Sequence, residues 1–167
     1  MDFKIPIQVD TVHQRRWKAD LVDWLHDFGF THAVTLSWNR TVTMGRARAD
    51  IGHLLRRCDR ALIGPKFNKM PSGERTQAVF AFEGTGHDHY HVHSLWRAPQ
   101  RKWFELGKLF GVERGGIWND IVETGSSAVD PIHHGRNDEI FGYVLKEQHR
   151  FSDDRLLVWA DEFHPVR

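Results

Sequence analysis

Apolar side chains recur three or four residues apart in two stretches of the first half of the chain. This spacing predicts two amphipathic helices, one ending at a Gly29 cap and one stopped by Gly64-Pro65. Their apolar stripes consist of Trp17, Leu21, Trp24, Leu25 and Phe28, and of Ala47, Ile51, Leu54, Leu55, Cys58 and Leu62. Each stripe marks the side of its helix that is expected to face a core.

Three shorter segments are rich in residues that suit a pleated surface and are predicted as strands: 32–38, 77–83 and 89–96. The second and third are separated by Gly84-Thr85-Gly86-His87-Asp88, which has the composition of a turn. These two strands should therefore form an antiparallel hairpin.

The C-terminal third is less regular. Pro99 is expected to open a helix, residues 117–123 are interpreted as a strand, and a loop is expected over about 124–136. A last helix should begin at Asn137 or Asp138 and run to about Gln148, while the tail that contains Leu156 to Trp159 fits no single element. Helices interspersed with a hairpin favour an α+β fold with a mostly antiparallel sheet.

Composition narrows the class of protein. A length of 167 residues suits one domain over 1–167, and a net charge of +1 does not indicate a globally basic nucleic-acid binder. The single cysteine, Cys58, excludes an internal disulfide framework and a cysteine-rich zinc module. No apolar run approaches the roughly 20 residues of a membrane span, and residues 1–4 lack a signal-peptide core. A cytoplasmic protein without membrane contact is therefore expected.

Histidines are concentrated on one predicted strand. Because alternate side chains of a strand share a face, His89, His91 and His93 should line one side of it. If the hairpin turns near His87, Glu83 lies opposite His91. Two imidazoles with a carboxylate suit a divalent ion such as Mg²⁺ or Mn²⁺, and also Zn²⁺. The alternative is a set of surface histidines or an adventitious metal patch.

The last predicted helix carries a second chemical signal. Tyr143 and Lys146 lie three residues apart and so share a helical face, away from the apolar side chains around them. A phenol beside an ammonium could act as a phosphate nucleophile with a cationic partner. In the structural alternative Tyr143 packs at the edge of the core and Lys146 is solvated.

Together these motifs resemble the HUH endonucleases, which include the rolling-circle replication initiator (Rep) proteins. The resemblance rests on His91-Val92-His93, the upstream Glu83 and Tyr143-Val144-Leu145-Lys146, with a weaker likeness of Ala33 to Ser37 to the first Rep motif, and it covers about residues 30–150. It implies a five-stranded antiparallel sheet flanked by helices. It also implies cleavage of single-stranded DNA, at an origin or a hairpin, by Tyr143, through a 5′-phosphotyrosine and a free 3′-OH.

The resemblance further implies that Glu83, His91 and His93 hold the metal ion, with His89 as a possible ligand, and that Lys146 assists at the phosphate. The sequence contains no glycine-rich phosphate loop of an ATPase, so unwinding is expected to need a separate helicase. A single-tyrosine transposase is a related alternative. The oligomeric state and the recognised DNA sequence are not indicated.

Binding of single-stranded DNA calls for cations and stacking rings. Candidate cations gather on the second predicted helix and in the loop after it: Arg46, Arg48, Arg56, Arg57, Arg60, Lys66 and Lys69. For each of them a solvated helix face is the alternative. Trp38, Trp96 and Trp118 are candidates for stacking, although tryptophan at strand positions often belongs to the core.

A different class of enzyme has a similar histidine pattern. His89-Tyr90-His91-Val92-His93 resembles the signature of histidine-triad nucleotide hydrolases and transferases, which implies His91 as the nucleophile and no obligatory metal. Ser94 departs from that pattern, and Glu83 and Tyr143 stay unexplained by it. A non-catalytic module that binds metal or DNA is the third alternative.

Overall fold

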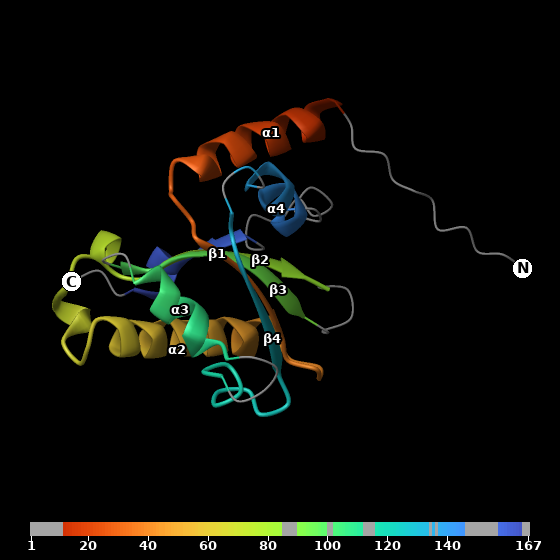
Figure 1. Ribbon diagram of the computed structural model, residues 1–167. Helices are drawn as coiled ribbons and strands as arrows, with labels where there is room; N and C mark the ends of the chain where they lie inside the picture. Colours follow the sequence, from red (N-terminus) through yellow and green to blue (C-terminus); the bar gives the residue numbers. More distant parts are fainter. Residues whose placement is uncertain are drawn as a thin grey trace, which may run out of the picture.

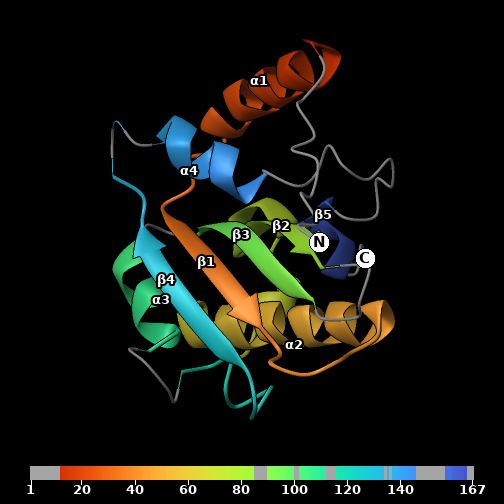
Figure 2. The ribbon, with the colours of Figure 1, turned by 90° about the vertical axis from the view of Figure 1, so that its right-hand side faces the viewer.

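A computed structural model describes residues 12–84, 90–99, 102–111, 116–133, 135, 137–145 and 157–164. In this part of the chain five strands form one antiparallel sheet in the order β4-β1-β3-β2-β5 (Figures 1 and 2). The strands are β1 (His32–Ser37), β2 (Gln77–Glu83), β3 (His91–Arg97), β4 (Ser126–Pro131) and β5 (Leu157–Trp159). The α+β fold with an antiparallel sheet is thus confirmed, and β2 and β3 form the predicted hairpin.

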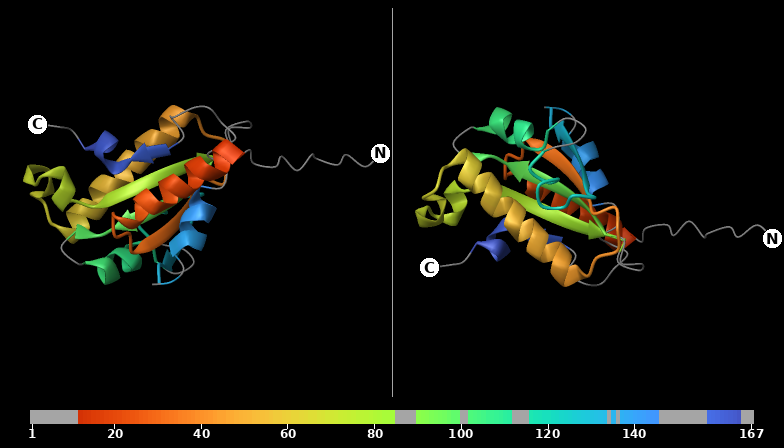
Figure 3. Two further views of the ribbon diagram at one scale, coloured as in Figure 1. Left: turned by 90° about the horizontal axis from the view of Figure 1, so that it is seen from above. Right: turned by 90° about the horizontal axis from the view of Figure 1, so that it is seen from below.

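Helices cover both faces of the sheet. α1 (Val12–His26) and α4 (Asn137–Val144) lie over one face, and α2 (Met44–Leu62) and α3 (Trp103–Leu109) lie over the other (Figures 1 and 3). Three short 3₁₀ turns complete the described elements: Phe67–Lys69, Ser72–Glu74 and Ala160–Phe163.

The alternation of side chains along the strands produces two cores. Phe80 and Phe82 of β2 point into the core beneath α2, whereas Val79 and Ala81 of the same strand point into the core beneath α1 and α4. Phe141 of α4 is buried in this second core. The two sides of β2 therefore face different cores. Glu83, two residues after Ala81, points to the same side of the sheet as Ala81.

Three sequence predictions for the C-terminal third differ from the structure. Residues 117–123 form turns and not a strand. The apolar side chains of Trp118 and Val122 are instead buried in the core beneath α2. The expected loop over 124–136 instead contains β4, a largely exposed edge strand that pairs with β1 through its backbone. The third helix begins at Trp103 and not at Pro99.

The C-terminal segment extends the sheet at its other edge. Leu157–Trp159 pairs with β2 as β5, and the 3₁₀ turn that follows packs against β2 and α2. The last helix ends at Val144 among the described residues, and its expected continuation to Gln148 lies outside them. None of the described helices has the length and apolar composition that crossing a membrane requires.

A buried ion pair joins α2 to the start of β2. Asp59 accepts hydrogen bonds from Arg75 Nε at 2.8 Å and from the backbone N–H of Thr76 at 2.9 Å. Both charged side chains are almost fully buried. The carboxylate therefore satisfies two donors that would otherwise be buried without a partner.

His164 packs beside this ion pair and should make stability depend on pH. Burial lowers the pKa of His164, the Arg75 guanidinium lowers it further, and the carboxylates of Asp59 and Asp161 oppose the change. Because this pKa is lowered on folding, the unfolded chain binds a proton more readily than the folded chain. The folded state is therefore most stable above about pH 6.5, and its free energy of unfolding declines as the pH falls below that value. Burial also lowers the pKa of His32, in the same direction.

We expect the free energy of unfolding to decline below about pH 6.5, by at most about 1.4 kcal/mol per pH unit for one such group. Urea unfolding of wild type and His164→Phe between pH 5 and 8 would measure this. The variant should show a shallower slope in that range, and an unchanged slope would contradict the assignment to His164.

Candidate metal centre and tyrosine

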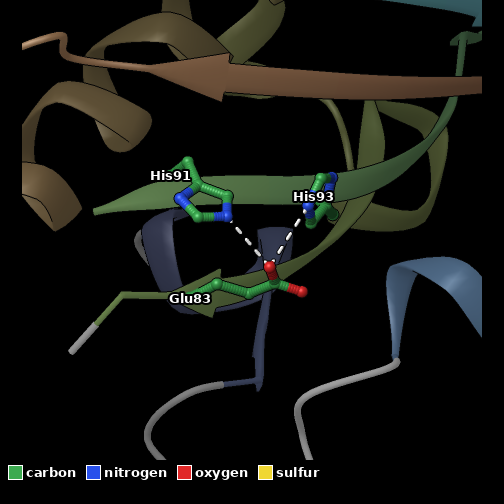
Figure 4. Close-up of side chains that lie close together, drawn as sticks. All are labelled: Glu83, His91 and His93. Atoms are coloured by element: carbon green, nitrogen blue, oxygen red, sulfur yellow. Dashed lines mark hydrogen bonds and ion pairs between the residues drawn. The ribbon is translucent and has the colours of Figure 1, made fainter. Parts of the chain in front are cut away.

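Glu83, His91 and His93 converge on the face of the sheet that α1 and α4 cover. In the hairpin register Glu83 pairs with His91 and Ala81 pairs with His93, so all three functional side chains point the same way. Glu83 Oε2 lies 2.9 Å from His91 Nε2 and 3.3 Å from His93 Nε2 (Figure 4). The predicted pairing of Glu83 with His91 is confirmed.

The three side chains differ in their access to solvent. Glu83 is 1% exposed and the side chain of His93 is 5% exposed, whereas that of His91 is 41% exposed. The carboxylate is therefore enclosed, and His91 forms the open side of the group. Such a combination of a buried anion with one open side suits a bound cation that a substrate can reach.

His93 is held by a residue of the neighbouring strand. Its Nδ1 lies 3.0 Å from Thr35 Oγ1, and its buried Nε2 has no hydrogen-bond partner among the described residues. If Nδ1 carries the proton and donates it to Thr35, Nε2 presents its lone pair toward Glu83. This is the tautomer that a metal-binding imidazole requires.

These residues fit a metal ion. One ligand atom from each of Glu83, His91 and His93 can be chosen so that all lie within 4.8 Å of one another. Two imidazoles and one carboxylate supply three donors, which leaves further coordination positions for water or substrate. The group could therefore hold a metal ion, as the sequence predicted.

Tyr143 lies at the same site. Its ring stands at 69° to the ring of His93, with 4.9 Å between the ring centroids. α4 buries Phe141 and Val144 against the sheet, which leaves Tyr143 at the margin of the helix with 54% of its surface exposed. The structure thus brings together the histidine strand and the tyrosine helix, which are about 50 residues apart in the sequence.

Two predicted site residues fall outside the described part of the chain. They are His89, the possible additional ligand, and Lys146, the expected cationic partner of Tyr143. Their roles stay predictions.

The predicted DNA-binding cations are not brought to this site. The arginines belong to α2, which covers the opposite face of the sheet, and Lys66 and Lys69 precede β2, whose far end carries Glu83. Three of the arginines form ion pairs, namely Arg46 with Asp50, Arg48 with Glu162 and Arg57 with Asp120, whereas Arg56 and Arg60 are exposed. Their part in DNA binding stays a prediction.

The three tryptophans considered for stacking are not available to a ligand. Trp38, Trp96 and Trp118 are fully buried in the core beneath α2. Trp38 donates a hydrogen bond to Asp50 and Trp118 donates one to the backbone oxygen of Ser37. The alternative that these tryptophans belong to the core is confirmed, because the rings are buried and each indole N–H has a hydrogen-bond acceptor.

Sequence reasoning missed the surroundings of the site. Thr35 supports His93, and Asp130, His133 and Glu139 line a pocket of about 550 Å³ that also includes His93 and Tyr143. Thr35 lies on a predicted strand, but its contact with His93 depends on the pairing of β1 with β3. Asp130 and His133 lie in the stretch that was expected to be a loop.

Comparison with protein-family models, with curated proteins and with solved structures finds no match to this chain.

Removal of the buried carboxylate should greatly weaken metal binding at this site. We expect Glu83→Gln to weaken Mn²⁺ affinity by about 100-fold or more, since loss of an orienting residue around a metal ligand alone costs 10–100-fold. Isothermal titration calorimetry measures the affinity, and saturating Mn²⁺ should raise the Tm of wild type but not of the variant. Glu123→Gln, at an exposed turn, is the matched control. Equal affinities of Glu83→Gln and wild type would contradict the assignment.

Proposed function

We propose that the chain is a metal-dependent endonuclease that nicks single-stranded DNA through a covalent bond to Tyr143. The observation that carries the proposal is the contact between the exposed Tyr143 ring and His93. A phenol that solvent and substrate can reach lies against the group that fits a metal ion. This combination suits nucleophilic attack on a phosphodiester.

In the proposed reaction the Tyr143 oxygen attacks the scissile phosphorus and its proton passes to solvent. The new O–P bond forms as the bond between phosphorus and the 3′ oxygen breaks. The leaving oxygen takes up a proton and becomes a free 3′-OH, while the 5′ phosphate stays on the tyrosine. The phosphotyrosine ester keeps the energy of the broken phosphodiester bond. A 3′-OH can therefore later displace Tyr143 from the phosphate and rejoin the strand.

Glu83, His91 and His93 would hold the ion, which supplies positive charge to the phosphate oxygens when bound. His93 also contacts the ring of Tyr143, and Thr35 orients His93. Two nitrogen ligands favour Mn²⁺ over Mg²⁺, whose preferred ligands are oxygens, and Zn²⁺ also accepts this set. We propose Mn²⁺ as the first ion to test.

A covalent adduct is the decisive product. The protein is incubated with Mn²⁺ and a pool of 5′-labelled and 3′-labelled single-stranded oligonucleotides, and the products are separated on a denaturing gel. The proposal requires a protein-linked species that carries only the 3′-labelled fragments, together with 5′-labelled fragments that end in a 3′-OH. A chelator should abolish both.

The histidine-triad alternative gives a different result. Turnover of a nucleoside phosphoramidate that survives Tyr143→Phe but not His91→Ala would support a nucleotide transferase and overturn the proposal. Metal binding with neither activity would support a non-catalytic module.

A further inference from the structure

The outer side of α2 carries a stripe of basic side chains. Its members are three or four residues apart and so share one side of the helix: His53, Arg56, Arg57 and Arg60. Arg57 is half-buried and the other three are exposed. This basic stripe is about 10 Å long, because an α-helix rises about 1.5 Å per residue. Together with Phe67 it lines a hollow of about 390 Å³, to which no carboxylate of the described residues contributes.

The acidic residues of α2 do not neutralise the stripe. The helix contains two, Asp50 and Asp59, and both are buried. Asp50 accepts a hydrogen bond from Trp38 Nε1, and Asp59 pairs with Arg75. α2 therefore directs its anions into the interior and leaves cations on its outer side.

The like charges of the stripe repel one another. Guanidiniums three or four residues apart destabilise a helix unless an anion lies near them. Arg57 has such an anion, since its Nη2 lies 2.7 Å from Asp120 Oδ2. Arg56 and Arg60 form no ion pair with any described residue. An anionic partner from outside the chain would relieve this repulsion.

The extent of the basic surface favours a chain of phosphates as that partner. The stripe is longer than one phosphate group, and the exposed Lys66 and Lys69, next to Phe67 in the 3₁₀ turn, extend it. The planar fork of an arginine side chain also matches the oxygens of a phosphate. Several consecutive phosphates could therefore bind along the helix.

The stripe offers charge without an apolar contact surface. No exposed phenyl or indole ring lines the hollow, since Phe67 is only 8% exposed. A partner would therefore be recognised through its phosphates and not through stacking of its bases. A helix that binds a membrane surface exposes large apolar side chains, and α2, all of which the structure describes, exposes none.

We propose that the basic stripe binds the phosphate backbone of DNA without reading its bases. α2 covers the face of the sheet opposite to the metal centre and Tyr143 (Figure 1). With the proposed function, one chain then holds two segments of DNA at once: a single strand at Tyr143 and a flanking segment behind the sheet. The choice of DNA rests on the proposed function, whereas backbone binding itself requires neither the metal ion nor Tyr143.

A DNA duplex tests the stripe separately from the proposed nicking site, which takes single strands. Wild-type protein in EDTA is titrated into a fluorescein-labelled duplex of about 20 base pairs at several NaCl concentrations, and fluorescence anisotropy measures binding. Arg56→Gln combined with Arg60→Gln should weaken binding by about tenfold or more at low salt. The slope of log affinity against log salt should become shallower by about two, one for each lost phosphate contact. Duplexes of different sequence should bind within about twofold of one another.

A matched control lies on the other side of the molecule. Arg15→Gln combined with Arg16→Gln removes the same charge from two exposed arginines of α1. This double variant should bind the duplex within about threefold of wild type. Because all four arginines are exposed, neither double variant should change the free energy of unfolding appreciably, which urea unfolding checks.

Four results would overturn the inference: no binding of the duplex by wild type, equal weakening in both double variants, tighter binding of an RNA duplex of the same sequence, or displacement of the duplex by poly-glutamate as readily as by unlabelled duplex. Failure of the proposed function is distinguished by the wild-type adduct assay. Adduct formation without stripe-dependent duplex binding overturns the inference alone, and stripe-dependent duplex binding without an adduct overturns the nuclease alone.

Discussion

Tyr143→Phe is expected to abolish the covalent adduct and to reduce strand cleavage by at least about 10³-fold. The change removes one oxygen atom, and this atom is the proposed nucleophile, whose removal in enzymes with covalent intermediates costs factors of this size or larger. Because Tyr143 is largely exposed, its replacement should leave the free energy of unfolding within about 0.5 kcal/mol of wild type. Single-turnover cleavage of labelled single-stranded DNA and urea unfolding measure the two quantities.

The chain offers a matched control for this experiment, since its second tyrosine, Tyr90, precedes β3 and is buried in the core beneath α2. Tyr90→Phe should form the adduct at a rate close to wild type once unfolding is taken into account. Cleavage that persists in Tyr143→Phe and still requires Mn²⁺ would show that water or another side chain attacks the phosphate. In that case the metal centre would stand and the tyrosine mechanism would not.

Asp59→Asn is expected to lower the free energy of unfolding by about 3–5 kcal/mol, the largest effect on stability that we anticipate. The substitution keeps the size of the side chain but leaves the Arg75 guanidinium buried without a counter-charge. It also weakens the acceptor for the backbone N–H of Thr76, at the start of β2. Urea unfolding at pH 7 measures the change.

A surface ion pair of the same kind serves as the control. Arg57 Nη2 lies 2.7 Å from Asp120 Oδ2, at least as close as the buried pair, but both side chains are substantially exposed. Asp120→Asn should therefore cost less than about 1 kcal/mol, because water screens and solvates both charges. If the two substitutions lower the free energy of unfolding equally, burial of the Asp59–Arg75 pair does not determine its contribution to stability.

The metal-binding group could be predicted largely from the sequence because it is local. Glu83, His91 and His93 belong to two strands that are consecutive in the sequence and pair with each other, and the period of two along a strand decides which side chains share a face. Thr35 could not be assigned in the same way. Its contact with His93 depends on β1 lying beside β3, a pairing between segments about 60 residues apart.

The edge strand β4 shows why one element was missed. Half of its residues are polar and most are exposed, so it lacks the apolar alternation that identifies a half-buried strand. Pairing with β1 satisfies the backbone groups along one side of β4 and holds the strand in place without a buried face. The apolar residues nearby, Ile117, Trp118 and Val122, suggested a strand where the chain forms buried turns.

The amino-acid sequence alone determined the helical stripes, the hairpin and the common face of the carboxylate and the two imidazoles, because each follows from spacing along a short segment. Only the tertiary structure decided that Tyr143 lies against His93 and that the arginines of α2 lie behind the sheet. An amphipathic helix specifies which of its own sides is buried but not which face of a sheet it covers. That choice depends on packing between residues far apart in the chain.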